Sequence, residues 1–435
     1  MEKSERFVNS TTTILQGIIL IILGILLIIG RNAFVDLVAY GVSLILVMMG
    51  ITNSIKNIIS KSEKVVTTNF IYSILNILTG AFIYFNTSIF VNMFPLLFTI
   101  YILIDAIIKS TVFYIYKKNK IPTRFAVLFR SILAYVFFCI MLFYPLIRLN
   151  VTYILAGIYV LLLALSYMIS GIESTIPIRK INKLKKKIKI ALPIFVAAFI
   201  PRMALEEINQ VFMPYRSNKE IEFKKIDEVP DIEVLVHMKK GLSASFGHVD
   251  LYYNGKIISY GSYDESNVLF NSSIGDGVLF ECDKDKYLEF CNTKVNKTIV
   301  GFGLKLTENQ KDAINRKIEE IKKSTYEWYP ESYLHKDKEF NDYASMLYNA
   351  TGAKFYKFID GKFKTYFVLN TNCVLLADEI LGTSGIDILK ISGLIAPGTY
   401  YEYFNREFKR KNSKVVSKKI YMDKSGILKD KEKTL

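Results

Sequence analysis

The sequence predicts a multi-domain protein: a six-helix all-α transmembrane bundle of three helical hairpins, followed by an α+β domain with a small antiparallel sheet. Three observations lead to this prediction. Residues 12–175 carry long apolar runs with the charges confined between them. Residues 214–435 alternate polar and apolar side chains, as a globular domain does. Between the two lies Arg179–Lys189 (RKINKLKKKIK), which has seven basic residues in eleven and cannot lie in hydrocarbon.

Six apolar runs are long enough to cross a bilayer as helices, which takes about 20 residues. They are Thr12–Ile29, Phe34–Ile55, Asn69–Phe85, Phe90–Phe113, Phe125–Leu146 and Val151–Ile172. The connections within each pair are short, whereas the loops between pairs are longer and basic. Because basic loops stay inside the cell, both ends of this region should face the cytoplasm, with the lipid bilayer of the plasma membrane as partner. The net charge of +16 largely reflects these flanking Lys and Arg residues, so we expect no nucleic-acid partner.

The pairs of runs also look like a repeat. Similar segments (GIILIILGILLII, SILNILTGAFIYF and SILAYVFFCIMLF) begin at Gly17, Ser73 and Ser131, and each leads into a second apolar run. This arrangement resembles the short-repeat membrane domain of the HdeD-type acid-resistance family, which implies a membrane stress protein. Within the runs, Asp105 and Lys109 stand four residues apart and are expected to pair with each other on one helix.

We divide the chain into residues 1–178, 179–213, 214–408 and 409–435: the membrane domain, a basic stretch with an interfacial helix, the α+β domain and a basic C-terminal tail. Ala191–Phe212 leaves an alternative open. It is read as a helix along the membrane surface, which keeps the soluble domain in the cytoplasm. If residues 191–205 instead span the bilayer, that domain lies outside the cell.

The soluble half shows strands and helices without a βαβ rhythm. His248–Tyr253 and Lys256–Tyr260 should form a hairpin across Asn254-Gly255, and Lys354–Phe358 should pair with Lys362–Val368 across Asp360-Gly361. Other strands are expected at Asp231–Val236, Gly277–Glu281 and Thr298–Leu306, and helices at Asp285–Cys291, Glu308–Lys323, Phe340–Asn349 and Asn372–Leu381. Thr307 and Gln310 form a capping box, and Gly382 ends the last helix.

Two residues of this half have the chemistry of a nucleophile and a base. Cys373 follows an N-cap residue, Asn372, at the first turn of a helix, where the helix dipole favours a thiolate. His248 opens a strand, and an imidazole beside a thiolate can take and return a proton during acyl transfer. The spacing of the four cysteines fits neither a disulfide scaffold nor a zinc site, so we expect no metal or cofactor.

The segments SASFGHVDLYYNGKIISYGSYD and NTNCVLLADEIL resemble the circularly permuted papain-like domains, which include NlpC-type peptidases and the lecithin retinol acyltransferase family. The resemblance implies that Cys373 is the nucleophile and His248 the general base. Those families place a further polar residue on the next strand, where this chain departs from them: His248 stands opposite Gly261. Ser259 is the nearest polar candidate, and Asp250 is read as a spectator on the same face. No role is assigned to His237 or His335.

We therefore expect a membrane-anchored cysteine hydrolase or acyltransferase acting on an amide, ester or thioester, with catalytic Cys373, His248 and Ser259. The substrate class stays open among peptides, lipids and acylated proteins, and the oligomeric state is unknown. The alternative is a non-catalytic membrane stress or interaction protein whose papain-like domain only binds. The cysteine and the histidine would then be ordinary buried structural residues.

Overall fold

The computed structural model describes residues 2–59, 63–175, 220–224, 228–238, 247–270, 272–295, 297–383, 397–409 and 413–421. The chain divides into two compact units: a helical one with residues 1–111 and 125–176, and a mixed one with residues 112–124 and 177–435. The basic stretch 179–189 and the segment Ala191–Phe212 lie outside the described residues, as do most of the tail and residues 241–246.

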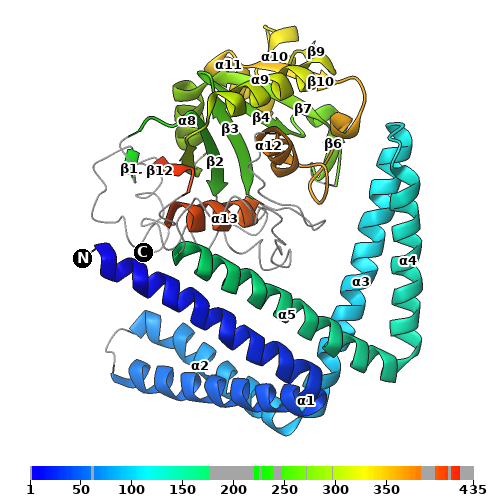
Figure 1. The fold of residues 1–435 in the computed structure, drawn as a ribbon, viewed down its shortest axis with the longest axis vertical. Coiled ribbons are helices and arrows are strands. Elements are labelled where there is room, and N and C mark those ends of the chain that lie inside the picture. The colour runs from blue at the N-terminus through cyan, green and yellow to red at the C-terminus, as the bar shows by residue number, and fades with distance from the viewer. Residues whose placement is uncertain are drawn as a thin grey trace. The chain divides into compact units, whose positions relative to one another are not determined.

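The described residues up to 175 form five long helices, coloured from blue to green in Figure 1, and the last turns of the third belong to the mixed unit. They are α1 (Glu2–Ile59), α2 (Glu63–Phe85), α3 (Thr87–Lys118), α4 (Arg124–Phe143) and α5 (Pro145–Thr175). The first helix is broken at Arg31, whose φ of 42° and ψ of −118° are not helical. This break falls inside the short connection expected between the first two apolar runs. The Arg31 guanidinium donates a hydrogen bond to Asn150 Oδ1 over 2.9 Å, which ties the break to α5.

The outer surfaces of these helices are apolar. Leu37, Leu44 and Phe85 are 67%, 62% and 80% exposed, and many further Ile, Leu and Phe side chains are similarly open. So much exposed apolar surface is unfavourable in water but suits lipid tails. Four helical segments among the described residues are long and apolar enough to span a bilayer: Ile14–Lys56, Thr87–Lys118, Arg124–Phe143 and Pro145–Leu165. Phe70–Phe85 is apolar but shorter. The expected ion pair between Asp105 and Lys109 is confirmed.

The second unit is built on an antiparallel sheet of nine strands in the order β1-β12-β8-β2-β3-β4-β7-β10-β9. In chain order these are β1 (Glu220–Lys224), β2 (Ile232–Met238), β3 (His248–Tyr253), β4 (Lys256–Gly261), β7 (Val278–Asp283), β8 (Thr298–Leu304), β9 (Thr325–Trp328), β10 (Lys354–Phe358) and β12 (Val415–Tyr421). A separate small sheet joins β5 (Val268–Leu269), β6 (Ile274–Asp276) and β11 (Thr365–Phe367) in the order β11-β6-β5.

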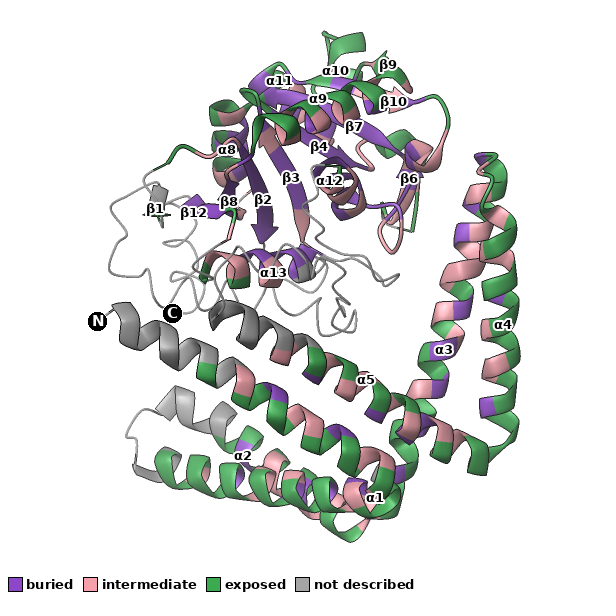
Figure 2. Cartoon of the chain, viewed as in Figure 1, coloured by how far each residue is buried: buried purple, intermediate pink, exposed green. Residues whose placement is uncertain are grey.

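Helices cover both faces of the large sheet, because successive strand residues point to opposite sides and both sides are apolar. One core contains Val234, Val236 and residues of α9 (Glu308–Lys323), α12 (Cys373–Gly382) and α13 (Pro397–Lys409). The other contains Leu235 and residues of α8 (Lys284–Thr293) and α11 (Tyr343–Thr351). A short helix, α10 (Glu331–Leu334), precedes α11. Figure 2 shows the central strands buried and the helices exposed on their outer sides.

The Asn254-Gly255 hairpin is confirmed: Tyr253 pairs with Lys256, and both turn residues have positive φ, 49° and 78°. The second expected hairpin is wrong. β10 pairs with β7 and β9, while Lys362–Lys364 form a 3-10 turn that leads into β11 of the small sheet. A two-residue hairpin of that type needs positive φ at both positions, and here only Gly361 has it, at 82°. The chain therefore leaves the large sheet at this point.

Two further differences concern the extent of the domain. The sheet is not small, because β1, β9 and β12 add three strands that the sequence patterns did not indicate. Residues 415–421, expected within a basic tail, form β12 between β1 and β8. The lysines of this strand obscured its pattern: Lys418 projects its ammonium to Asn405 Oδ1 of α13 at 2.9 Å, while Val415 and Ile420 are buried.

Candidate active site

His248 is the first residue of β3 and lies at the end of a central strand. Gly247, directly before it, has a φ of 62°, a conformation that glycine adopts without steric cost. In the sheet His248 pairs with His237, the sixth residue of β2. The rings of the two histidines meet edge to face, with centroids 5.4 Å apart. The register therefore brings two imidazoles together in a largely buried position.

Cys373 is the first residue of α12, and it is 3% exposed. The expected N-cap is confirmed, since the Asn372 side chain accepts a hydrogen bond from the Leu375 N–H over 3.0 Å. The Asn372 amide also donates to the Val368 carbonyl at 2.9 Å, which anchors the cap to the preceding turn. Placed at a helix N-terminus, the thiol sits where the aligned peptide dipoles favour negative charge.

The structure brings Cys373 and His248, 125 residues apart in the sequence, close enough for the charge of one to act on the other. Three oxygens crowd the Nε2 side of the His248 ring: Asp250 Oδ1 at 2.8 Å, Ser259 Oγ at 2.9 Å and Tyr263 Oη at 3.0 Å. Because the Asp250 carboxylate is negatively charged, this environment favours a hydrogen on Nε2.

Asp250 occupies the centre of the cluster. It is 1% exposed, and its two carboxylate oxygens are divided between the histidines: Oδ1 contacts His248, and Oδ2 lies 2.6 Å from His237 Nε2. Tyr287 of α8 donates a further hydrogen bond to Oδ2 over 2.7 Å. The two imidazole contacts are close but poorly aligned as hydrogen bonds, so electrostatic attraction dominates them.

These contacts set the charge states of the cluster. Burial disfavours the charged form of His248, but the negative Asp250 and its contact with Cys373 outweigh burial and raise its pKa to about 10. Burial lowers the pKa of His237 to about 4, although Asp250 opposes this effect. Burial alone would raise the pKa of Asp250, yet the two histidines hold it well below its usual range. At neutral pH the cluster thus holds a cationic His248, an anionic Asp250 and a neutral His237.

Ser259, the candidate third residue, lies in β4 and is buried. Its hydroxyl contacts both His248 Nε2 at 2.9 Å and the hydroxyl of Tyr263 at 2.7 Å. The Ser259 hydroxyl is uncharged, whereas the Asp250 carboxylate that contacts the same His248 nitrogen carries a full negative charge.

Tyrosines surround Cys373. Tyr366 of β11, together with Tyr260 and Tyr400, lies close enough to Cys373 for the charge of the cysteine to act on its hydroxyl group. Burial, the leading cause, together with the charge of Cys373, raises the pKa of all three well above the ordinary value, so their hydroxyls stay protonated and can act as donors. The wall around the thiol is therefore aromatic, with polar hydroxyl groups set into it.

Sequence reasoning assigned no function to Asp250 or His237, and both now stand in the cluster. Asp250 follows His248 by two residues, so it shares its face, and that spacing was the available signal. His237 had none, because its position opposite His248 depends on a strand register set between two separated segments. Tyr263 and Tyr366 were equally hidden. Cys282 and Cys291 are buried in the core that also holds Tyr287, near enough for the charge of Asp250 to act on them, and His335 is half exposed beside Glu331.

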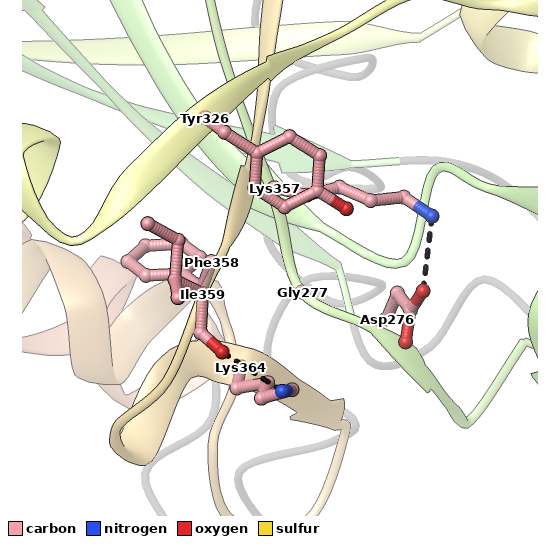
Figure 3. Close-up of a pocket in the computed structure, with 7 residues that line it drawn as sticks. All are labelled: Asp276, Gly277, Tyr326, Lys357, Phe358, Ile359 and Lys364. Carbon is pink, nitrogen blue, oxygen red and sulfur yellow. Dashed lines mark hydrogen bonds and ion pairs between the residues drawn. The ribbon is translucent and has the colours of Figure 1, made fainter.

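Within the described residues, no group of three or more His, Cys, Asp or Glu side chains is arranged to hold a metal ion. A pocket of about 220 Å³ lies by β9, β10 and β6 and contains neither Cys373 nor His248 (Figure 3). Its cations are already engaged: Lys357 Nζ lies 2.9 Å from Asp276 Oδ2, and Lys364 Nζ donates to the Ile359 carbonyl at 2.8 Å. This pocket is separate from the cysteine-histidine cluster.

Comparisons with protein-family models, curated proteins and solved structures give no match to this chain.

Proposed function

We propose that this protein is a membrane-anchored cysteine hydrolase or acyltransferase, with Cys373 as nucleophile and His248 as general base and acid. The observation that carries the proposal is the contact between a thiol at a helix N-terminus and an imidazole that a buried carboxylate keeps positively charged. An imidazolium beside a thiol favours the thiolate, which is the reactive form. The papain-like resemblance of the two segments agrees with these roles.

The reaction follows from these positions. Cys373 Sγ attacks the carbonyl carbon of an amide, ester or thioester, and the carbonyl electron pair moves to oxygen. Backbone N–H groups at the start of α12 stabilise that oxyanion. As the intermediate collapses, His248 gives its proton to the leaving group, and an acyl thioester remains on Cys373. Water or an acceptor nucleophile then attacks the thioester while His248 takes its proton, which regenerates the free enzyme.

We also propose how the apolar helices cross the membrane. Counting the two parts of α1 around Arg31 separately, and including Phe70–Phe85, gives six crossings in three hairpins. An even number of crossings from a cytoplasmic N-terminus leaves the catalytic domain in the cytoplasm, which favours a cytoplasmic peptide, lipid or acylated protein as substrate. A cysteine introduced at Val229, 80% exposed, reports the side. Its protection from an impermeant maleimide in intact cells supports this topology, whereas labelling supports an odd number.

Acylation of the purified full-length protein tests the chemistry. Incubation with an activated ester such as 4-nitrophenyl acetate, followed by peptide mass spectrometry, should place the acetyl group on Cys373. The Cys373→Ala variant should lose this adduct, and His248→Asn should form it much more slowly. Cys282→Ala is the matched control, because it removes another buried thiol and should leave the adduct unchanged. Equal acylation of Cys373 in wild type and His248→Asn would remove the proposal.

One observation favours a second candidate, a binding protein without catalysis. Cys373 is only 3% exposed, so a substrate carbonyl has little direct access to its sulfur in this conformation. On this second reading the cluster is a buried polar network that rigidifies the domain. The acylation experiment separates the two candidates, since a closed network gives no Cys373 adduct in any variant.

A further inference from the structure

The proposed chemistry uses Cys373 and His248, with Asp250 beside them, and leaves one member of the cluster without a role. His237 is 2% exposed, yet its Nε2 lies 2.6 Å from Asp250 Oδ2. A buried histidine without a partner costs free energy, and neither ring nitrogen of His237 forms a well-directed hydrogen bond. Such a costly residue in contact with the site needs an explanation.

The contact fixes the state of the His237 ring. Two lone pairs 2.6 Å apart would repel, so the ring carries its hydrogen on Nε2, although the N–H is not well aligned with the carboxylate oxygen. A second positive charge next to His248 is disfavoured in the buried site, so the ring remains neutral. His237 thus presents a neutral, polar Nε2–H beside the carboxylate oxygen that does not face His248, and it attracts that oxygen electrostatically.

The carboxylate is held on both sides as a result. Tyr287 Oη and His237 Nε2 share Oδ2, which turns Oδ1 toward His248 Nε2 at 2.8 Å. The donors come from α8 and β2, two elements that frame β3 where Asp250 sits. A carboxylate bound at one oxygen can rotate about its χ2 angle, whereas one bound at both oxygens has a fixed plane.

We infer that His237 is a positioning residue for the proposed reaction: it acts through Asp250, whose carboxylate it locks in the orientation that holds His248 against Cys373. The inference rests on the proposed function. His237 then has a role in the reaction that differs from those of the nucleophile and the base. When His248 gives up its proton to the leaving group, Asp250 loses its positive partner, and the His237 N–H continues to hold the carboxylate in place.

The test uses His237→Phe, which keeps an aromatic ring but has no donor, and His237→Gln, whose amide N–H can take the place of Nε2–H. Alkylation of Cys373 by iodoacetamide is followed on the full-length protein in detergent, together with its acylation by 4-nitrophenyl acetate. His237→Phe should slow both reactions roughly tenfold, the effect of losing one hydrogen bond to a charged group. His237→Gln should restore most of the rate.

Coupling to Asp250 separates positioning from a general structural effect. In an Asp250→Asn background, His237→Phe should cause no further loss, because the charge through which it acts is gone. A tenfold loss in both backgrounds, or equal losses for Phe and Gln, would overturn the inference while leaving the proposed function intact. If Cys373 in the wild type reacts no faster than in His248→Asn, the proposed function itself fails, and that result comes from a different pair of proteins.

Discussion

Replacing Asp250 by Asn removes the buried charge between the two histidines and keeps the size of the side chain. The pKa of His248 is raised from 6.5 to about 10. That difference corresponds to about 5 kcal/mol, at ~1.36 kcal/mol for each pKa unit. Asp250 is the largest cause of the rise and Cys373 the next, so we assign about 3 kcal/mol to the carboxylate. A full ion pair at 2.8 Å gives about 6 kcal/mol at an effective dielectric constant of ~20, which bounds this share from above.

Without that charge His248 holds its proton about 100-fold less tightly, so the imidazolium that pairs with the thiolate is lost near neutral pH instead of near pH 10. The alkylation rate of Cys373 at pH 7 should then fall about 100-fold, the factor that ~3 kcal/mol implies. In the wild type, the imidazolium that supports alkylation of Cys373 should persist to about pH 10. In the variant, that support should be lost near neutral pH.

The assay is iodoacetamide alkylation of detergent-solubilised protein between pH 5 and 10, with Cys373 followed by peptide mass spectrometry. Ser259→Ala is the control, because it removes a neutral contact to the same His248 nitrogen and should slow the reaction far less. An Asp250→Asn protein with the wild-type rate and pH profile would refute the assignment of charges in the cluster.

Three other predictions concern stability and are measured by unfolding of the full-length protein. Asn372→Ala removes the cap of α12 and should lower the free energy of unfolding by about 1 kcal/mol. An unchanged free energy of unfolding would mean that the helix end is mobile and the cap does not stabilise it. Phe404→Ala should lower the free energy of unfolding by about 3–5 kcal/mol, since this fully buried α13 side chain stacks on Phe302 with ring centroids 5.6 Å apart. Leu269 is 63% exposed, so Leu269→Ala should change the free energy of unfolding by less than about 0.5 kcal/mol. A pH series should show two slopes. The contribution of His248 is complete below pH 6.5 and is lost as the pH rises toward 10, and the protonation of His237 in the unfolded chain lowers stability as the pH falls from 6.5 toward 4. His237→Phe should flatten the acid slope alone, and an unchanged acid slope would contradict the neutral state of His237.

Local signals in the sequence predicted much of this fold. Hydropathy indicated the apolar helices, the Asn254-Gly255 turn indicated β3 and β4, and capping residues located α9 and α12. Each of these depends on residues that are close in the chain. The start of α12 at Cys373 and of β3 at His248 follow from the same local rules.

What the sequence could not predict depends on register between distant segments. His237 stands opposite His248 because β2 and β3 align in one particular register across a connection whose length is not informative. Tyr366 reaches Cys373 only because β11 leaves the large sheet, and the missing positive φ at Asp360 is visible only in the folded chain. Asp250, the charged partner of His248, could be placed on the same strand face from the sequence. Its importance could not be predicted, because it depends on burial and on His237.

The position of β12 has a consequence for how the domain is made. This strand lies between β8 and β1, so β1 reaches the sheet only by pairing with a segment nearly 200 residues further along the chain. During synthesis, the edge of β8 stays open until residues 415–421 leave the ribosome, long after the apolar helices have emerged. An open edge of this kind can pair with another chain, so a premature stop before Val415 should produce aggregation rather than a shortened domain.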